Sequence, residues 1–254
     1  MAQNIYDRED FYSAYIEHID RSDKEADLSK DPAWTRISPM LPPVKDKHVL
    51  DLGCGTGWFA RWAMNQGAKS VLAVDISEKM LARAKELTST EKYPQIEYRR
   101  EDLDQISLPE SDSNKYGLVF SSLTLHYLSN LDAIMSLVER VLSPGGSFVF
   151  NVEHPVYTAP FKPAVVTDPA TGEKSWNLNY YYKEGERVID WLAKGVRKQH
   201  RTVTTYMASI FKVGLEVTGF VEFLPTDEEL EKDIVDEIEG IRPLFLMMSV
   251  RKRV

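Results

Sequence analysis

Two patterns of hydrophobic and polar positions alternate along the chain. One consists of short apolar runs rich in β-forming residues, and the other of longer stretches with helical spacing. The apolar runs lie at 48–52, 70–75, 95–100, 117–122 and 146–152. The helical stretches between them are 58–66, a segment that Ser77 can cap, and 131–142, which ends at Pro144-Gly145-Gly146. This alternation predicts a parallel, doubly wound α/β sheet.

This alternation of strand-like and helix-like patterns ends after residue 152. Residues 155–200 are rich in proline and aromatic side chains without clear periodicity, so we interpret 153–200 as a cap inserted over the site. The last predicted elements are a helix over 203–211 that ends at Gly214, strands near 215–223 and 244–250, and a solvated acidic helix face over 227–239.

Composition narrows the class of protein. The 254 residues contain 31 Lys+Arg and 39 Asp+Glu, a net charge of −8 that disfavours nucleic acid as a partner. No Pro/Gly/Ser-rich linker divides the chain, which predicts one domain over 1–254. Cys54 is the single cysteine, and the sequence has neither a signal-peptide pattern nor an apolar run long enough for a membrane. We therefore expect a cytoplasmic protein without a membrane partner.

A glycine-rich segment, VLDLGCGTG at 49–57, ends the first strand and opens the first helix. Ligands bind at such strand ends in α/β sheets. A dinucleotide site would need a third glycine where Trp58 stands, because the pyrophosphate approaches the helix closely there. Asp51 instead offers a carboxylate to the cationic amino group of an amino-acid-bearing cofactor.

DLGCGTG resembles the first motif of class I S-adenosylmethionine (SAM)-dependent methyltransferases, and later segments match that family in order. The resemblance implies a Rossmann-like, mostly parallel sheet of seven strands with an antiparallel last strand and helices on both faces. It also implies SAM as the cofactor, S-adenosylhomocysteine as the product, and a lid of N-terminal helices over 1–40 that carries Tyr6, Phe11, Tyr12 and Tyr15.

The same resemblance implies roles for individual residues. Asp75 matches the acid that binds both ribose hydroxyls, and Asp102 matches the residue that accepts a hydrogen bond from the adenine amine. The full predicted cofactor set is Tyr6, Tyr15, Asp51, Gly53, Gly55, Gly57, Asp75, Ile76, Met80, Glu101, Asp102, Leu103 and Ser121.

Candidate bases gather where the predicted strands end. We expect the catalytic residues among His126, Glu153, His154 and His200. Several structural alternatives stay open: His126 can be a packed histidine, Glu153 and Arg201 can form an ion pair that holds the cap, and the cap aromatics can be its own core. No carboxylate cluster has convincing ligand spacing, so we predict no metal site.

Methyl transfer needs alignment more than a particular acid or base, because positioning alone can supply about 7–11 kcal/mol. The chain lacks the Asn-Pro-Pro-Tyr and Pro-Cys elements of nucleic-acid methyltransferases. We therefore predict methyl transfer to an O, N or S nucleophile of a small molecule, with the acceptor and oligomeric state undetermined. The alternatives are a non-catalytic SAM-binding regulator, an NAD(P)-dependent oxidoreductase and a protein methyltransferase.

Overall fold

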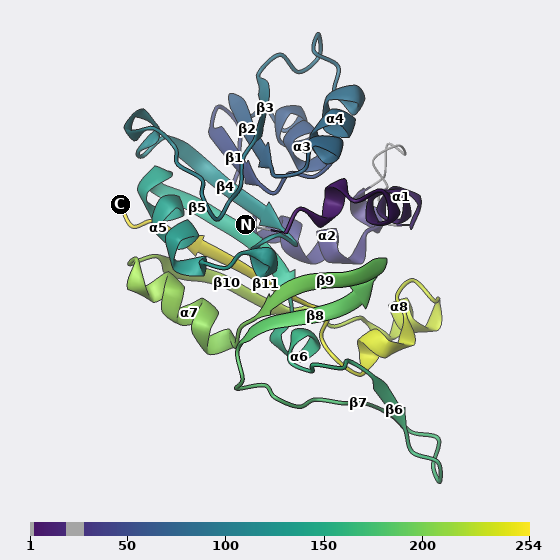
Figure 1. Cartoon of the computed structure of the whole chain (residues 1–254). Helices are drawn as coiled ribbons and strands as arrows, with labels where there is room; N and C mark the ends of the chain where they lie inside the picture. The colour runs from purple at the N-terminus through teal and green to yellow at the C-terminus, as the bar shows by residue number, and fades with distance from the viewer. Residues whose placement is uncertain (1–2, 19–27) are drawn as a thin grey trace.

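The computed structural model describes residues 3–18 and 28–254, and it is built around one sheet of seven strands (Figure 1). The strand order is β10-β11-β5-β4-β1-β2-β3. Their bounds are β1 His48–Leu52, β2 Ser70–Asp75, β3 Ile96–Arg100, β4 Tyr116–Ser122, β5 Leu142–Glu153, β10 Glu216–Glu222 and β11 Phe245–Arg251. β11 is antiparallel to both of its neighbours, whereas β1 to β5 pair in parallel. The predicted Rossmann-like sheet is confirmed.

Helices cover both faces of this sheet. The main helices are α3 Trp58–Asn65, α4 Glu78–Leu87, α5 Leu131–Val141 and α7 Val203–Lys212. Three of these four begin at a polar side-chain cap, whereas α3 begins at Gly57. Ser77 accepts from the amide of Met80, and Asn130 accepts from that of Ala133, which satisfies amides that a helix leaves free. One core lies under α5 and α7, and the other lies under α3 and the N-terminal helix α2 (Pro32–Ile37).

The predicted turn before β5 proves to be part of that strand. β5 starts at Leu142 directly after α5, and its register against β4 shifts between Tyr116 and Leu118. Gly145 has a φ of 74°, and its amide donates to the carbonyl of Lys252. The Pro-Gly-Gly element therefore forms an irregularity within the paired strand, because the final strand offers it backbone partners.

The N-terminal segment divides into two parts. The turn Ile5–Asp7 and α1 Glu9–His18 precede the undescribed residues 19–27; the turn Leu28–Lys30, α2 Pro32–Ile37 and the turn Ser38–Met40 follow them. Trp34 and Ile37 are buried in the core beneath α3. Ile5 and Phe11 instead form a small core with Val196 of the cap. The part before residue 19 therefore packs on the cap.

The cap contains strands that its sequence pattern did not reveal. It consists of α6 Pro155–Thr158, the hairpin β6 Val165–Thr167 with β7 Lys174–Trp176, and the hairpin β8 Gly185–Trp191 with β9 Ala193–His200. Figure 1 shows the β6–β7 hairpin extending away from the rest of the molecule. Inward positions of β8 and β9 hold the charged residues Arg187 and Lys198, which hides the usual apolar alternation of a strand.

The acidic stretch after β10 differs from the predicted solvated helix face. It forms a short helix, α8 Asp227–Glu231, and a turn at Glu237–Gly240. Glu229 forms an ion pair with Arg36 at 2.5 Å, and Glu239 is buried. Glu229 therefore joins this stretch to the N-terminal segment, whereas Glu239 pairs with Arg242 three residues further along. Elsewhere, short 3₁₀ turns occupy Glu110–Asp112 and Leu125–Tyr127. Within the described ranges, no helix is long and apolar enough to cross a membrane.

Candidate active site

The glycine-rich turn between β1 and α3 has a backbone that other residues would not tolerate. Gly53 and Gly57 have φ values of 79° and 76°. A Cβ on Gly53 would lie 2.1 Å from Oγ1 of Thr124, and one on Gly57 would lie 2.2 Å from the hydroxyl of Tyr98. The turn, which also contains Gly55, therefore needs glycine for both its conformation and its close contacts.

Asp75 at the end of β2 ties this turn to the next helix. Its Oδ2 accepts from the amide of Gly55 at 2.8 Å, and its Oδ1 accepts from the amide of Ser77 at 2.9 Å. Burial raises the pKa of Asp75, although these backbone hydrogen bonds oppose the shift. The carboxylate is thus held in one orientation beside the glycine turn.

Asp51 is a second buried carboxyl at the same strand ends. It is 1% exposed, and its Oδ2 has no hydrogen-bond partner among the described residues. Burial, followed by repulsion from Asp75, raises the pKa of Asp51 well above its ordinary value. A carboxyl in this position is suited to a cation or a hydrogen-bond donor supplied by a ligand.

The N-terminal segment reaches the same edge through a residue that the sequence analysis missed. Oδ1 of Asp7 accepts from the hydroxyl of Ser77 at 2.5 Å and from the amide of Lys79 at 3.0 Å, so Asp7 adds to the cap of α4. Tyr6 beside it packs against Tyr15 and Tyr127, with ring centroids 5.3 and 6.1 Å apart. This brings the predicted lid aromatics to the carboxyl edge of the sheet.

The other predicted cofactor residues lie nearby. Met80 is buried, and its Cε lies 3.6 Å from the place a Cβ on Gly55 would take. Ile76 follows Asp75 and is half-buried, and Leu103 is buried. The amide of Glu101 donates to the carbonyl of Asp75 at 2.9 Å.

Two polar side chains that were predicted to contact the cofactor form hydrogen bonds within the protein. Asp102 accepts from the amide of Asp104 at 3.0 Å through Oδ1, which shapes the turn after β3. Ser121 is fully buried, and its hydroxyl donates to the carbonyl of Leu52 at 2.8 Å. The Ser121 side chain therefore links β4 to β1, and its predicted contact with the cofactor stays a prediction.

Glu153 and His126 come together at the end of β5. The amide of Glu153 approaches Nδ1 of His126 at 3.5 Å, so the neutral ring carries its proton on Nε2, which lies 3.9 Å from Oε2 of Glu153. Burial, with Lys198 and Arg201 nearby, lowers the pKa of His126 well below its usual range. His126 is therefore a neutral N–H group that faces the carboxylate.

The ion pair to Glu153 comes from Lys198 and not from Arg201. Lys198 of β9 donates to Oε1 of Glu153, while Arg201 donates to the carbonyls of Leu125 and Leu128. Oε2 of Glu153 is buried and has no hydrogen-bond partner among the described residues. Burial raises the pKa of Glu153 even though Lys198 opposes the shift. The suggested ion pair between Glu153 and Arg201 is therefore wrong, because Glu153 pairs with Lys198.

His154 and His200 have both ring nitrogens occupied by protein groups. His154 accepts from the amide of Val156 at 3.0 Å and contacts Oε1 of Glu222 at 2.9 Å. His200 contacts the hydroxyl of Thr158 at 2.9 Å and the carbonyl of Tyr181 at 2.8 Å. These contacts favour structural roles. Of the four candidates, Glu153 keeps a buried oxygen without a hydrogen-bond partner among the described residues, and Nε2 of His126 faces that oxygen at 3.9 Å. In the described part of the chain, no group of three or more His, Cys, Asp or Glu is placed to hold a metal ion.

A buried asparagine was also missed. Asn151 lies on β5 before Glu153, is 4% exposed, and leaves its Oδ1 without a partner in the described ranges. Its polar side chain inside the apolar run GSFVFNV was a visible signal in the sequence.

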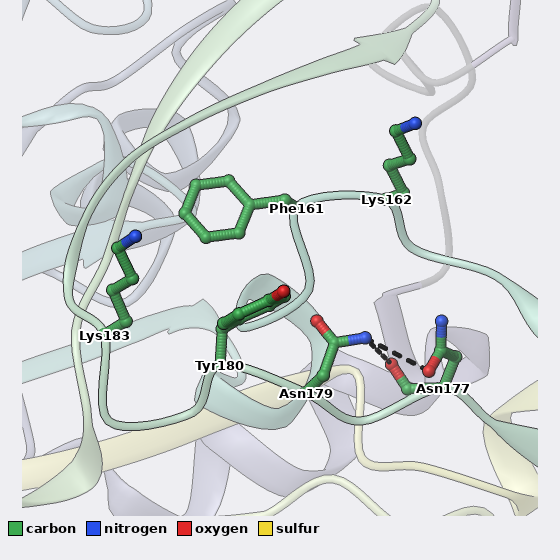
Figure 2. Close-up of a pocket in the computed structure, with 6 residues that line it drawn as sticks. All are labelled: Phe161, Lys162, Asn177, Asn179, Tyr180 and Lys183. Carbon is green, nitrogen blue, oxygen red and sulfur yellow. Dashed lines mark hydrogen bonds between the residues drawn. The ribbon is translucent and has the colours of Figure 1, made fainter.

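A separate hollow of about 440 Å³ lies in the cap, and none of the predicted site residues line it. Figure 2 shows its lining residues, Phe161, Lys162, Asn177, Asn179, Tyr180 and Lys183.

Comparison with known proteins decides the family. Residues 50–150 match the model of a methyltransferase domain. The crystal structure of an S-adenosylmethionine-dependent methyltransferase from Mesorhizobium loti is 41% identical, with a TM-score of 0.80, over 89% of this chain and 100% of that one. The chain belongs to the class I SAM-dependent methyltransferases. A putative methyltransferase structure from Listeria monocytogenes is 38% identical, with a TM-score of 0.76, over 88% and 99% of the two chains.

Curated relatives of this methyltransferase differ in the acceptors that their names state. A tRNA U34 carboxymethyltransferase from Hahella chejuensis is 34% identical over 55% of this chain and 41% of its own length. A malonyl-[acyl-carrier protein] O-methyltransferase from Serratia marcescens is 29% identical over 59% of this chain and 55% of its own length. The chain therefore spans about half the length of these named relatives, and the shared part does not fix the acceptor.

The site fits the cofactor of a SAM-dependent methyltransferase. SAM carries an ammonium group and ribose hydroxyls, and the buried Oδ2 of Asp51 lacks the donor that such groups supply. The glycine turn leaves no side chain between the backbone and a ligand at Gly55, and Asp75 is fixed beside it.

Proposed function

We propose that this methyltransferase transfers the methyl group of SAM to an O, N or S nucleophile of a small molecule, enclosed beneath the cap and the N-terminal segment. The observation that supports the proposal is the free Oε2 of Glu153. It lies beside His126 and is bound on its other oxygen by Lys198 of the cap. A carboxylate covered in this way is accessible to a small acceptor more readily than to a folded macromolecule.

In this proposal Asp51 binds the ammonium group of SAM, and Asp75 binds its ribose hydroxyls. Bound SAM supplies an electrophilic methyl group attached to a sulfonium. Glu153 accepts the proton that the acceptor loses as its O, N or S bonds to the methyl carbon and the bond from that carbon to sulfur breaks, which leaves S-adenosylhomocysteine. The Nε2–H of His126 faces Oε2 of Glu153 at 3.9 Å without forming a hydrogen bond to it, which leaves Oε2 available to the acceptor. Tyr6, Tyr15 and the cap exclude water from the reacting groups.

The small-molecule proposal competes with the acceptors named for the relatives, tRNA and an acyl group on a carrier protein. The net charge of −8 is unfavourable for tRNA at a distance. The compartment predicted from the sequence, the cytoplasm, contains all three kinds of acceptor. A direct experiment on the full chain must therefore separate them.

The test first measures binding of S-adenosylhomocysteine to the wild type and to Asp75→Ala by calorimetry. We expect binding that falls at least tenfold in the variant, about 1.4 kcal/mol. The protein then receives SAM with a tritiated methyl group and a cell extract separated by mass. Label in a low-mass compound that chromatography separates from SAM supports the proposal; label confined to RNA or protein overturns it.

A further inference from the structure

The hollow of about 440 Å³ on the cap has room for a small organic molecule, because ligand pockets measure about 300–1,000 Å³. It lies between the stretch that follows α6, which supplies Phe161 and Lys162, and the stretch 177–183. Figure 2 shows Lys162 and Lys183 on either side of the Phe161 ring. The six lining residues include these two lysines and no acid, so the hollow is positively charged.

The two walls of the hollow are joined by a buried arginine of β8. Arg187 is 2% exposed, and its guanidinium donates to the carbonyl of Ala159 at 2.9 Å and to that of Lys183 at 2.6 Å. Its guanidinium carbon lies 4.0 Å from the ring centroid of Phe161. On the other wall, the amide of Lys183 donates to the carbonyl of Tyr180 at 2.9 Å and closes a turn. The shape of the hollow is therefore fixed before a ligand enters.

The two lysines of the hollow keep their charges free. Among the described residues, no acid forms an ion pair with Lys162 or Lys183, whereas Lys198 of the same cap pairs with Glu153. The nearest compensation for Lys183 is the ring of Phe161, whose centroid lies 5.4 Å from Nζ. In a chain with a net charge of −8, two neighbouring ammonium groups without acidic partners are suited to an anion.

The remaining lining offers flat apolar surface. Phe161 is 41% exposed and Tyr180 is 58% exposed, and their ring centroids lie 5.3 Å apart in an edge-to-face arrangement. Aromatic side chains exposed in a pocket pack well against the ring of a ligand. The hollow thus combines two cations with an aromatic surface.

We propose that this hollow is a second ligand site, which binds an aromatic phosphate monoester. The phosphate carries about −1.5 to −2 charges at pH 7, which match the ammonium groups of Lys162 and Lys183. The aromatic body of the ligand packs against Phe161 and Tyr180. This inference goes beyond methyl transfer and does not rest on the proposed function.

The proposed ligand site is separate from the candidate active site. Pro160 and Pro163 face the narrow space beside Glu153, whereas Phe161 and Lys162 between them face the hollow. One short segment therefore forms a wall between the two, and a ligand in the hollow does not compete with S-adenosylhomocysteine.

Three compounds with the same body test the charge preference: naphthyl phosphate, naphthyl sulfate and naphthol. At neutral pH the phosphate is close to a dianion, the sulfate is a monoanion and naphthol is neutral. Calorimetry at low salt, on the full chain with and without saturating S-adenosylhomocysteine, should give binding that weakens in that order. At about 1 M salt, where the Debye length is about 3 Å, the preference for the phosphate should largely disappear.

Substitutions in the lining separate the two parts of the site. Lys162→Gln and Lys183→Gln should each weaken naphthyl phosphate at least about threefold and leave naphthol unchanged. Tyr180→Asn should weaken all three compounds, and asparagine tolerates the φ of 57° at this position. The matched controls are Lys194→Gln and Tyr182→Asn, because both residues are exposed on the cap and neither lines the hollow.

Two sets of results would overturn the ligand site. One is equal binding of the three compounds, or no binding of any of them. The other is binding that is lost in Glu153→Gln or in the presence of S-adenosylhomocysteine but kept in both lysine variants, since the compounds would then occupy the candidate active site. Absence of S-adenosylhomocysteine binding would instead overturn the proposed function and leave the test of the hollow intact.

Discussion

Asp51 shows how a single residue can serve ligand binding at the expense of stability. Its carboxyl is buried next to Asp75, and one oxygen lacks any partner in the described ranges. In the absence of a cation, such a group costs about 1–3 kcal/mol. Binding sites commonly contain strained or unsatisfied groups of this kind, because the ligand supplies what the fold omits.

Asp51→Asn should therefore stabilise the ligand-free protein and weaken S-adenosylhomocysteine binding. The pKa of Asp51 is raised in the folded state, so the folded chain keeps a proton that the unfolded chain loses near its ordinary value of 3.8. The wild type thus loses stability as pH rises above about 4. The gain in melting temperature of Asp51→Asn should be near zero at pH 4 and largest at neutral pH.

Thermal unfolding of both proteins across pH 4–8 measures this difference, with the exposed Glu91→Gln as the control. A melting-temperature gain that stays constant with pH would contradict the buried-charge explanation.

At the scale of elements, the cap is joined to the sheet by a buried charge pair. β9 supplies Lys198, β5 supplies Glu153, and Lys198 also lies 4.6 Å from the ring centroid of Trp191. The pair fixes the β8–β9 hairpin over the end of the sheet. Its contribution differs from that of exposed pairs, because either charge left alone would be buried without a partner.

Lys198→Met should lower the free energy of unfolding by about 3–5 kcal/mol, since it leaves Glu153 buried and unpaired. The double variant Lys198→Met with Glu153→Gln should recover much of that loss. Urea unfolding measures both, and the exposed Lys194→Met in the same strand serves as the control. Strictly additive losses in the double variant would show that the two residues do not interact energetically.

The N-terminal segment is held by a second element-scale contact, Asp7 at the start of α4. Asp7→Ala removes this cap, worth about 1 kcal/mol, and should release the aromatic residues of α1 from the site. We expect faster hydrogen exchange over residues 5–18 and weaker S-adenosylhomocysteine binding. The exposed Ser13→Ala on α1 is the control. Unchanged exchange and affinity in Asp7→Ala would refute the lid.

Across the whole molecule, the buried charges are segregated. Asp51 and Asp75 lie at the cofactor end, whereas Arg187, Lys198 and Arg201 lie on the side of the cap. The outer surface is acidic on balance, with a net charge of −8 for the chain.

A molecule-wide consequence concerns nucleic acid. A net negative protein releases few counter-ions from a polyanion, so unfractionated tRNA should show no measurable binding at about 0.15 M salt. Fluorescence anisotropy of labelled tRNA, with and without S-adenosylhomocysteine, measures this. Saturable submicromolar binding would favour the acceptor named for the Hahella relative over a small molecule.

The sequence by itself determined the sheet, its helices and the family, because burial and element type depend on local spacing. The strands at 48–52 and 70–75 match β1 and β2 to the residue, and the glycine turn follows from positions 53, 55 and 57. The β8–β9 hairpin escaped prediction because the charged Arg187 and Lys198 occupy buried positions, and β6 and β7 are three-residue strands without a buried side chain.

Only the tertiary structure decided which polar groups meet. Lys198 and Glu153 are 45 residues apart, and Asp7 and Ser77 are 70 apart. No local pattern encodes such pairs, because the path of the chain between them depends on how whole elements pack. Spacing placed four candidate residues at strand ends: His126, Glu153, His154 and His200. Packing left a buried oxygen without a partner among the described residues on Glu153, with His126 facing it, and gave both ring nitrogens of His154 and His200 to protein groups.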